Sequence, residues 1–193
     1  MVELANCLDE NGDPRHIESL HVKIDGQIHE NEIRRVREPD SLPFPDRDIY
    51  YDKYPALKNA GTKPVWVVRG CPYECSYCFN HRLKEMTVGK GKYLRYGSVE
   101  RTIEEIKFVK EKYGMKWASL MGDTVNADKK WFLRLLESYK KEIDVPFLVN
   151  VRVENLDEES VRKMSEAGCD RVVFAIESGD EKLRNGRCRT KPS

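Results

Sequence analysis

The sequence lacks two features that would indicate a membrane or nucleic-acid role. No apolar run approaches the roughly 20 residues that cross a bilayer, and the N-terminus lacks the apolar core of a signal peptide. Net charge is almost absent, because 34 basic and 33 acidic side chains leave only +1, which argues against a dedicated nucleic-acid binder. We therefore expect neither a membrane partner nor a nucleic-acid partner.

Cysteine is scarce outside one short segment. Three of the six cysteines, Cys7, Cys169 and Cys188, are scattered along the 193 residues, and the other three form a cluster. This distribution does not fit a disulfide framework, and a cluster of this kind is typical of metal binding or catalysis in a reducing compartment. We expect a cytoplasmic protein, and a hydrophobic content of 39% is enough for one domain with a packed core.

Residues 1–63 predict the tail of an upstream domain followed by a proline-rich linker. Alternating residues at 20–24 and 27–29 flank Asp25-Gly26, a dipeptide that favours the tight turn of a hairpin. The prolines that follow are Pro39, Pro43, Pro45, Pro55 and Pro64. Because proline cannot continue a helix, they exclude a long helix here and indicate an extended segment packed against another part of the chain.

Residues 64–193 predict an α/β core. Short apolar strands are expected at 65–68, 117–121, 147–151 and 171–176. Helices are expected between them, with Ser98, then Asn126 or Asp128, then Asp157 as candidate N-caps. Strands and helices that alternate in this way form a parallel sheet, and such sheets place their chemistry on the loops after the carboxyl ends of the strands.

The clustered cysteines follow the first of these strands. Cys71, Cys75 and Cys78 have the spacing C-x3-C-x2-C, and no fourth cysteine lies nearby. Three thiolates can hold three irons of a [4Fe–4S] cluster and leave one iron open to a small molecule. The main alternative is a zinc-binding interaction module that uses these thiols and His81. The cluster is favoured because structural zinc usually organises small domains, whereas this loop lies on a large sheet.

This arrangement resembles the signature of the radical S-adenosylmethionine (radical SAM) enzymes, in which the open iron binds the amino and carboxylate groups of SAM. The resemblance implies a partial TIM-like (βα) barrel that holds a [4Fe–4S] cluster and SAM. It also implies a small-molecule substrate and a one-electron reductant such as flavodoxin or ferredoxin. The reaction implied is reductive cleavage of SAM to methionine and a 5′-deoxyadenosyl radical, which removes a hydrogen atom from the substrate.

The same resemblance implies two SAM contacts near the first and second strands. Tyr77, just before the third cysteine, would lie beside the adenine, and the alternative is a loop aromatic that packs on the sheet. Gly122 and Asp123 end the second strand and partly match the Gly-Gly-Glu stretch that holds the SAM amino group in this family. The alternative for this pair is an ordinary turn between a strand and a helix.

Two further SAM contacts are implied at the third and fourth strands. Arg152 would pair with the SAM carboxylate, since a guanidinium matches carboxylate geometry, and the alternative is a salt bridge with Glu154. Glu177 would accept hydrogen bonds from the ribose hydroxyls, and the alternative is a carboxylate at the start of a helix.

The run from Asp40 to Asp48 resembles the linker that joins a cobalamin-binding domain to the barrel in cobalamin-dependent radical SAM proteins. This implies a cobalamin-dependent parent, with methylation as the leading reaction and rearrangement as another. Two departures from the family pattern indicate a fragment of such a parent, because the cobalamin domain and the end of the barrel are missing. The D-x-H-x-x-G pattern that supplies the lower cobalt ligand does not occur, and only four of the family's six strands are predicted.

The C-terminal sequence also departs from the family pattern. After Leu183, the expected amphipathic helix is opposed by Gly186 and Pro192. We therefore expect a fragment of a longer enzyme, whose open sheet exposes an apolar edge and is of low stability. A catalytically dead iron–sulfur scaffold is the corresponding alternative function.

Overall fold

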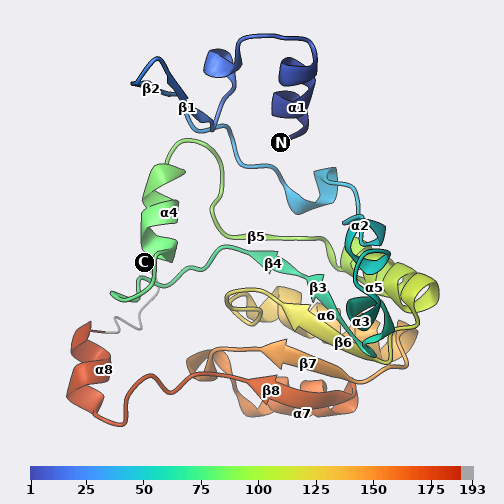
Figure 1. Cartoon of the computed structure of the whole chain (residues 1–193). Coiled ribbons are helices and arrows are strands. Elements are labelled where there is room, and N and C mark those ends of the chain that lie inside the picture. The colour runs from blue at the N-terminus through green and yellow to red at the C-terminus, as the bar shows by residue number, and fades with distance from the viewer. Residues whose placement is uncertain (188–193) are drawn as a thin grey trace.

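The structure is a computed structural model in which residues 1–187 are described. Figure 1 shows a sheet covered by helices, with the N-terminal segment lying apart from it. The helices are α1 (Val2–Asp9), α2 (Asp48–Tyr51), α3 (Pro55–Asn59), α4 (Asn80–Met86), α5 (Val99–Tyr113), α6 (Lys129–Glu142), α7 (Glu158–Glu166) and α8 (Glu181–Arg187). The strands are β1 (His21–Ile24), β2 (Gln27–Glu30), β3 (Thr62–Trp66), β4 (Val68–Arg69), β5 (Arg95–Tyr96), β6 (Trp117–Met121), β7 (Phe147–Asn150) and β8 (Cys169–Val173).

The central sheet is parallel and has the strand order β3-β6-β7-β8. The strands follow one another in space as they do in sequence, and α5, α6 and α7 provide the connections between them (Figure 1). This arrangement confirms the predicted α/β class and the partial TIM-like barrel. The carboxyl ends of all four strands meet at one edge, where a site is expected.

The helix ends follow from capping residues. The Ser98 side chain accepts a hydrogen bond from the Arg101 amide, and α5 stops at Gly114, which adopts the left-handed conformation at φ 62°. Asp128 caps α6, so that of the two predicted caps Asp128 is correct and Asn126 is not. Asp157 caps α7 as predicted.

The first predicted strand is in fact two strands. β3 begins at Thr62, three residues earlier than expected, and it pairs with β6. After Val67, whose amide donates to the Met121 carbonyl, the chain leaves the sheet and β4 pairs with β5 in the antiparallel sense. An apolar run cannot reveal such a division, because both strands are buried on the same core.

The C-terminal part also differs from the prediction. β8 begins at Cys169 and ends at Val173, so the expected strand at 171–176 is shifted toward the N-terminus. Within residues 1–187, no strand other than β7 pairs with β8. No inter-strand hydrogen bonds on the other edge of β8 therefore extend the strand past Val173. α8 continues through Gly186 to Arg187, which contradicts the expected stop after Leu183, and a glycine costs a helix only about 1 kcal/mol. Cys188 and Pro192 lie outside the described residues.

The N-terminal hairpin is confirmed, as is the exclusion of a long helix from the proline-rich stretch, but this stretch is not extended throughout because it contains the short helices α2 and α3. Asp25 and Gly26 have φ values of 50° and 79°, as a tight hairpin turn requires. The segment 38–64 contains α2 and α3 and packs on α5. The Arg101 side chain of α5 donates to the main-chain carbonyls of Pro39 and Leu42 and lies over the Phe44 ring.

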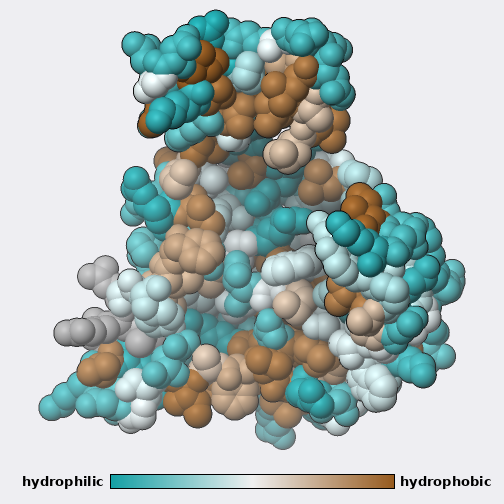
Figure 2. Space-filling view, in the orientation of Figure 1, coloured by the Kyte–Doolittle hydropathy of each residue, from teal (hydrophilic) through white to brown (hydrophobic). Residues whose placement is uncertain are grey.

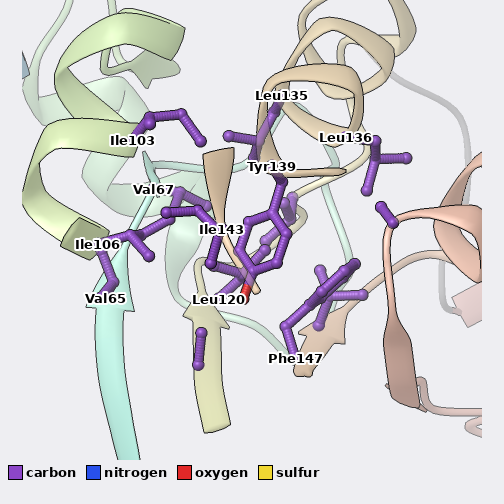
Figure 3. Close-up of a cluster of buried hydrophobic side chains, with 14 of the residues drawn as sticks. Val65, Val67, Ile103, Ile106, Leu120, Leu135, Leu136, Tyr139, Ile143 and Phe147 are labelled. Atoms are coloured by element: carbon purple, nitrogen blue, oxygen red, sulfur yellow. The ribbon is translucent and has the colours of Figure 1, made fainter. Parts of the chain in front are cut away.

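The core lies between the parallel sheet and its helices. Figure 3 shows side chains from β3, β6 and β7 packed against those of α5 and α6. Val65, Ile106, Leu120, Leu135 and Phe147 have no exposed surface, and the burial of each such side chain contributes on the order of 2 kcal/mol. The core thus fixes the strands whose ends carry the candidate site.

Among the described residues, no helix combines the length and hydropathy that a bilayer crossing requires.

Candidate functional site at the carboxyl ends of the strands

The cysteine loop begins where β4 ends and runs directly into α4. Gly70 starts it at φ 85°, and a Cβ atom there would lie 2.5 Å from the Tyr93 carbonyl oxygen. Only glycine accommodates both the left-handed conformation and this close approach of the β5 segment. The Cys78 amide donates to the Cys75 carbonyl at 2.9 Å, which folds the loop back on itself. The three thiols are free, and Cys75 is buried.

Polar groups from two other strand ends contact the loop thiols. The Cys71 sulfur lies 3.3 Å from the Thr124 hydroxyl oxygen, which follows β6. Burial raises the pKa of Cys71, and the Thr124 hydrogen bond acts in the opposite direction. An Nη1 donor of Arg152, which follows β7, lies 3.6 Å from the Cys75 sulfur. The sheet therefore brings three strand ends together around two of the three cysteines.

Arg152 is held against the cysteine loop and not directed freely into solvent. Its guanidinium lies over the Tyr73 ring, 4.0 Å from the ring centroid, and its Nε is 3.3 Å from a Glu154 carboxylate oxygen. Its main chain exchanges two hydrogen bonds with the Asn126 side chain, each of 2.9 Å. The salt bridge with Glu154, which was the alternative role for Arg152, is thus present together with a position beside the cysteine loop.

Tyr77 and Glu177 lie near each other at the carboxyl ends of the strands. Burial, together with the nearby Glu177 carboxylate and the Cys75 thiol, raises the pKa of Tyr77. The Tyr77 side chain is otherwise 58% exposed and does not pack on the sheet as the plainer interpretation required. Glu177 has φ 65°, a left-handed conformation that is uncommon for residues other than glycine and is concentrated at functional sites.

Gly122 has a packing role that the sequence does not reveal. A Cβ atom at this position would lie 2.1 Å from Cγ1 of Val68, so glycine is required for β4 to cross the end of β6. The neighbouring Asp123 is exposed, and its charge contributes to raising the pKa values of Cys71 and Tyr93. Asp123 therefore lies close enough to Cys71 and Tyr93 for its charge to act on both groups.

A cavity of about 290 Å³ opens at this edge of the sheet. Asp123, Arg152 and Glu177 line it, whereas Tyr77, Gly122 and the three cysteines are not among its lining residues. The cavity is near the lower limit for a small-molecule pocket, and one of its walls is the segment after β8. The structure thus gathers three of the five predicted SAM contacts in one hollow, whereas Tyr77 belongs to the cysteine loop and Gly122 packs against Val68.

Several residues of the site were not identified from the sequence. Thr124 carries a hydroxyl just after the end of β6. Its place next to the predicted Asp123 is the only feature of the sequence that points to Thr124. Tyr73 lies within the cysteine loop, and its hydroxyl donates to Asn155 at 2.5 Å. The sequence offers Asn126 as a candidate helix cap, but its side chain forms a hydrogen bond with the Arg152 main chain instead. These contacts join segments that are far apart in sequence, so no local sequence pattern predicts them.

The donor set fits a multi-iron cluster better than a single zinc ion. A single zinc needs four ligands at about 2.0 to 2.3 Å, so they must converge on one point. Among residues 1–187, no three or more His, Cys, Asp or Glu side chains converge in this way. A cluster binds each thiolate to a different iron, so its ligands are spread around a loop. The hydroxyl and guanidinium donors beside Cys71 and Cys75 suit thiolate ligands.

Two relatives of this chain are named as methyltransferases. An uncharacterised methyltransferase of Pyrococcus horikoshii is 30% identical over 94% of this chain and 39% of its own length. A bacteriochlorophyllide d C-8(2)-methyltransferase of Chlorobaculum tepidum is 35% identical over 63% of this chain and 28% of its own length. The chain therefore spans well under half of the relatives that it matches.

A solved structure shares the fold. It is the radical S-adenosylmethionine methyltransferase TsrM from Kitasatospora setae, which was determined with cobalamin and a [4Fe–4S] cluster bound. The match has a TM-score of 0.70 and covers 99% of this chain and 38% of that one, with 17% sequence identity. The family model described as the radical SAM superfamily matches residues 66–193, which include the cysteine loop and all the strand ends described above. The resemblance seen in the sequence is thus confirmed, and this chain belongs to the radical SAM superfamily.

Proposed function

We propose that this chain is the cluster- and SAM-binding part of an enzyme that methylates or rearranges a small molecule. The observation that carries the proposal is the position of the cysteine loop. It follows the first strands of a parallel sheet and lies beside a cavity lined by Asp123, Arg152 and Glu177. Parallel sheets place chemistry at this edge, and three free thiols in one loop suit an iron–sulfur cluster.

The roles that we propose for the residues follow from their chemistry. Cys71, Cys75 and Cys78 ligate three irons, and when the cluster is reduced it supplies one electron that cleaves SAM to methionine and a 5′-deoxyadenosyl radical. Asp123 and the main chain at Gly122 hold the SAM ammonium group. These groups suit it because a carboxylate and carbonyl oxygens accept hydrogen bonds from a cation.

The other three contacts complete the proposed SAM site. Arg152 pairs with the SAM carboxylate while it remains beside Cys75, since a guanidinium has five donors and can serve two acceptors. Glu177 accepts from the ribose hydroxyls, and Tyr77, whose pKa the Glu177 carboxylate helps to raise, lies beside the adenine.

We further propose that residues 1–63 are the tail of an upstream domain and its linker, and that residues 64–193 are the radical SAM core. The whole protein would then use cobalamin as well as the cluster. Relatives named as methyltransferases and a cobalamin-containing structural neighbour support this assignment. The electron donor would be a flavodoxin or a ferredoxin, and the compartment would be the cytoplasm.

The test is anaerobic reconstitution with iron and sulfide, followed by electron paramagnetic resonance of the reduced protein with and without SAM. We expect a [4Fe–4S]⁺ signal whose shape changes when SAM is added, because SAM then occupies the open iron. A signal that is indifferent to SAM would contradict the proposal and favour a catalytically dead scaffold. Failure to bind any cluster would contradict it outright.

A matched pair of cysteine variants sharpens this test. Cys75→Ala removes a buried ligand, and we expect it to lose the cluster signal and SAM cleavage. Cys7→Ala removes an equally free thiol in α1, far along the chain from the loop, and should leave both intact. Retained SAM cleavage in Cys75→Ala would refute the ligand assignment.

A further inference from the structure

Tyr73 is a buried tyrosine inside the cysteine loop that ties this loop to the end of β7. It lies midway between Cys71 and Cys75 in the sequence and is only 5% exposed. Its ring lies 4.0 Å, measured at the centroid, from the Arg152 guanidinium carbon. Its hydroxyl donates to the Asn155 side-chain oxygen at 2.5 Å. One side chain of the loop thus contacts both the guanidinium and the turn that carries it.

The turn after β7 is held so that only the Arg152 side chain keeps freedom to move. Arg152 directly precedes the short 3-10 helix Val153–Asn155, and the Asn155 amide donates to the Arg152 carbonyl. The Tyr73 hydroxyl therefore fixes this turn relative to the cysteine loop. From the other side, the Asn126 side chain forms two hydrogen bonds with the Arg152 main chain. What remains to be fixed is the orientation of the guanidinium, which is the group that the Tyr73 ring covers.

The acidic side chains near the guanidinium hold it less firmly. Glu154 is 50% exposed, and an exposed ion pair contributes little. The Arg152 Nε is buried and forms no hydrogen bond within residues 1–187, although it lies 3.3 Å from a Glu154 carboxylate oxygen. Asp123 and Glu177 line the same cavity as Arg152, and in the described part of the chain neither forms an ion pair with it. The carboxylates alone therefore do not fix the guanidinium plane.

The cavity side of Arg152 is largely apolar. Val173, Phe174 and Ile176 line the cavity together with Arg152, and each of the three is exposed. Figure 2 shows hydrophobic residues at the surface where β8 lies in Figure 1. Such side chains accept no hydrogen bond, and a guanidinium has only donors. The buried aromatic support for Arg152 thus comes from the loop side, from Tyr73.

We propose that Tyr73 is a positioning residue for Arg152, an inference that rests on the proposed function. A cation over a buried aromatic face is attracted to it, and the flat guanidinium stacks on the flat ring. The ring thereby keeps one Nη1 donor at Cys75 and leaves the other donors available to the SAM carboxylate. A planar set of donors pairs well with a carboxylate only when its plane is correctly presented. Tyr73 therefore acts on SAM affinity through Arg152.

Binding of SAM to the reconstituted and oxidised chain tests the proposal without turnover, because cleavage needs the reduced cluster. Equilibrium dialysis with labelled SAM gives Kd, and iron content shows that the cluster is retained. Tyr73→Leu removes the ring and should raise Kd by roughly tenfold. Tyr73→Phe keeps the ring and should raise it by only about two- to threefold. The control, Tyr51→Leu, makes the same change at a tyrosine of α2 that is 8% exposed, and it should leave Kd unchanged.

A double-mutant cycle distinguishes positioning from a general structural role. If Tyr73 acts through Arg152, Tyr73→Leu should raise Kd by less than about twofold in an Arg152→Gln background, where no guanidinium remains to be oriented. A residue that merely supports the loop would weaken binding by the same factor in both backgrounds. An equal factor in the two backgrounds would therefore refute the proposal.

The outcomes separate this inference from the proposed function. If the unaltered chain holds a cluster and binds SAM, but Tyr73→Leu binds SAM equally well, the positioning role is refuted and the proposed function stands. If the unaltered chain holds no cluster or binds no SAM, the proposed function itself fails. If Tyr73→Leu does not fold or loses iron, Tyr73→Phe and Asn155→Ala decide the question. Each should raise Kd by about two- to threefold, but not in the Arg152→Gln background, and no change in either variant would overturn the proposal.

Discussion

The buried ion pair between Arg47 and Glu105 is the contact most open to a quantitative test. It joins the proline-rich segment to α5 at 2.8 Å, and both side chains are only 10% exposed. Arg47 also donates to the main-chain carbonyl of Pro64, which lies in β3 between the buried residues Lys63 and Val65. Glu105→Ala would leave the arginine charge buried and without its carboxylate. Breaking one side of a buried pair costs about 3 kcal/mol or more, because the remaining charge is not compensated.

For a chain of this size, a loss of about 3 kcal/mol corresponds to a fall in Tm of roughly 6 to 12 °C. Urea unfolding followed by circular dichroism would measure the free energy, and a thermal scan would measure Tm. Glu104→Ala is the matched control, since it is the neighbouring glutamate on the same helix and is exposed; it should change stability by no more than about 0.5 kcal/mol.

A double variant separates charge from packing in this contact. Arg47→Met with Glu105→Leu removes both charges and keeps apolar volume, so it should recover most of the stability lost by Glu105→Ala. Equal losses for Glu105→Ala and Glu104→Ala would refute the claim that this pair is buried and important. A double variant that is as unstable as Glu105→Ala would place the loss in packing instead.

Three further outcomes are expected. Gly122→Ala should cost about 1 to 3 kcal/mol in urea unfolding, since its Cβ would lie 2.1 Å from a Val68 methyl carbon, and added Val68→Ala should restore part of this; no loss would contradict the packing role. Tyr139→Phe should cost about 1 kcal/mol by removing a buried hydrogen bond of 2.9 Å to a main-chain carbonyl. Burial raises the pKa of Tyr139, so the native state keeps a proton that the unfolded chain releases. Stability should therefore fall as pH rises above about 10, and it should fall less steeply in Tyr139→Phe. Equal slopes for the two proteins would refute the role of the Tyr139 hydroxyl in this pH dependence. Arg152→Gln should lower the reduction potential of the reconstituted cluster by on the order of tens of millivolts in a redox titration, because a cation 3.6 Å from Cys75 stabilises the reduced state, and an unchanged potential would exclude this effect.

The sequence determined the elements whose signals are local. The strand at 117–121 and the helices after Ser98, Asp128 and Asp157 lie where capping residues and hydrophobic periodicity placed them. The hairpin turn at Asp25-Gly26 was likewise fixed by backbone preferences. The cysteine spacing was sufficient to indicate the family, because three thiols in one loop are rare without a metal or redox role.

Only the tertiary structure decided which strand ends face one another. The contacts from Thr124 to Cys71 and from Arg152 to Cys75 link residues that are more than 50 positions apart, so periodicity and capping rules carry no information about them. The same holds for the division of the first apolar run into β3 and β4, since burial alone does not distinguish a parallel from an antiparallel partner. Local chemistry selected the residues that can form a site, and packing of the sheet determined which of them meet.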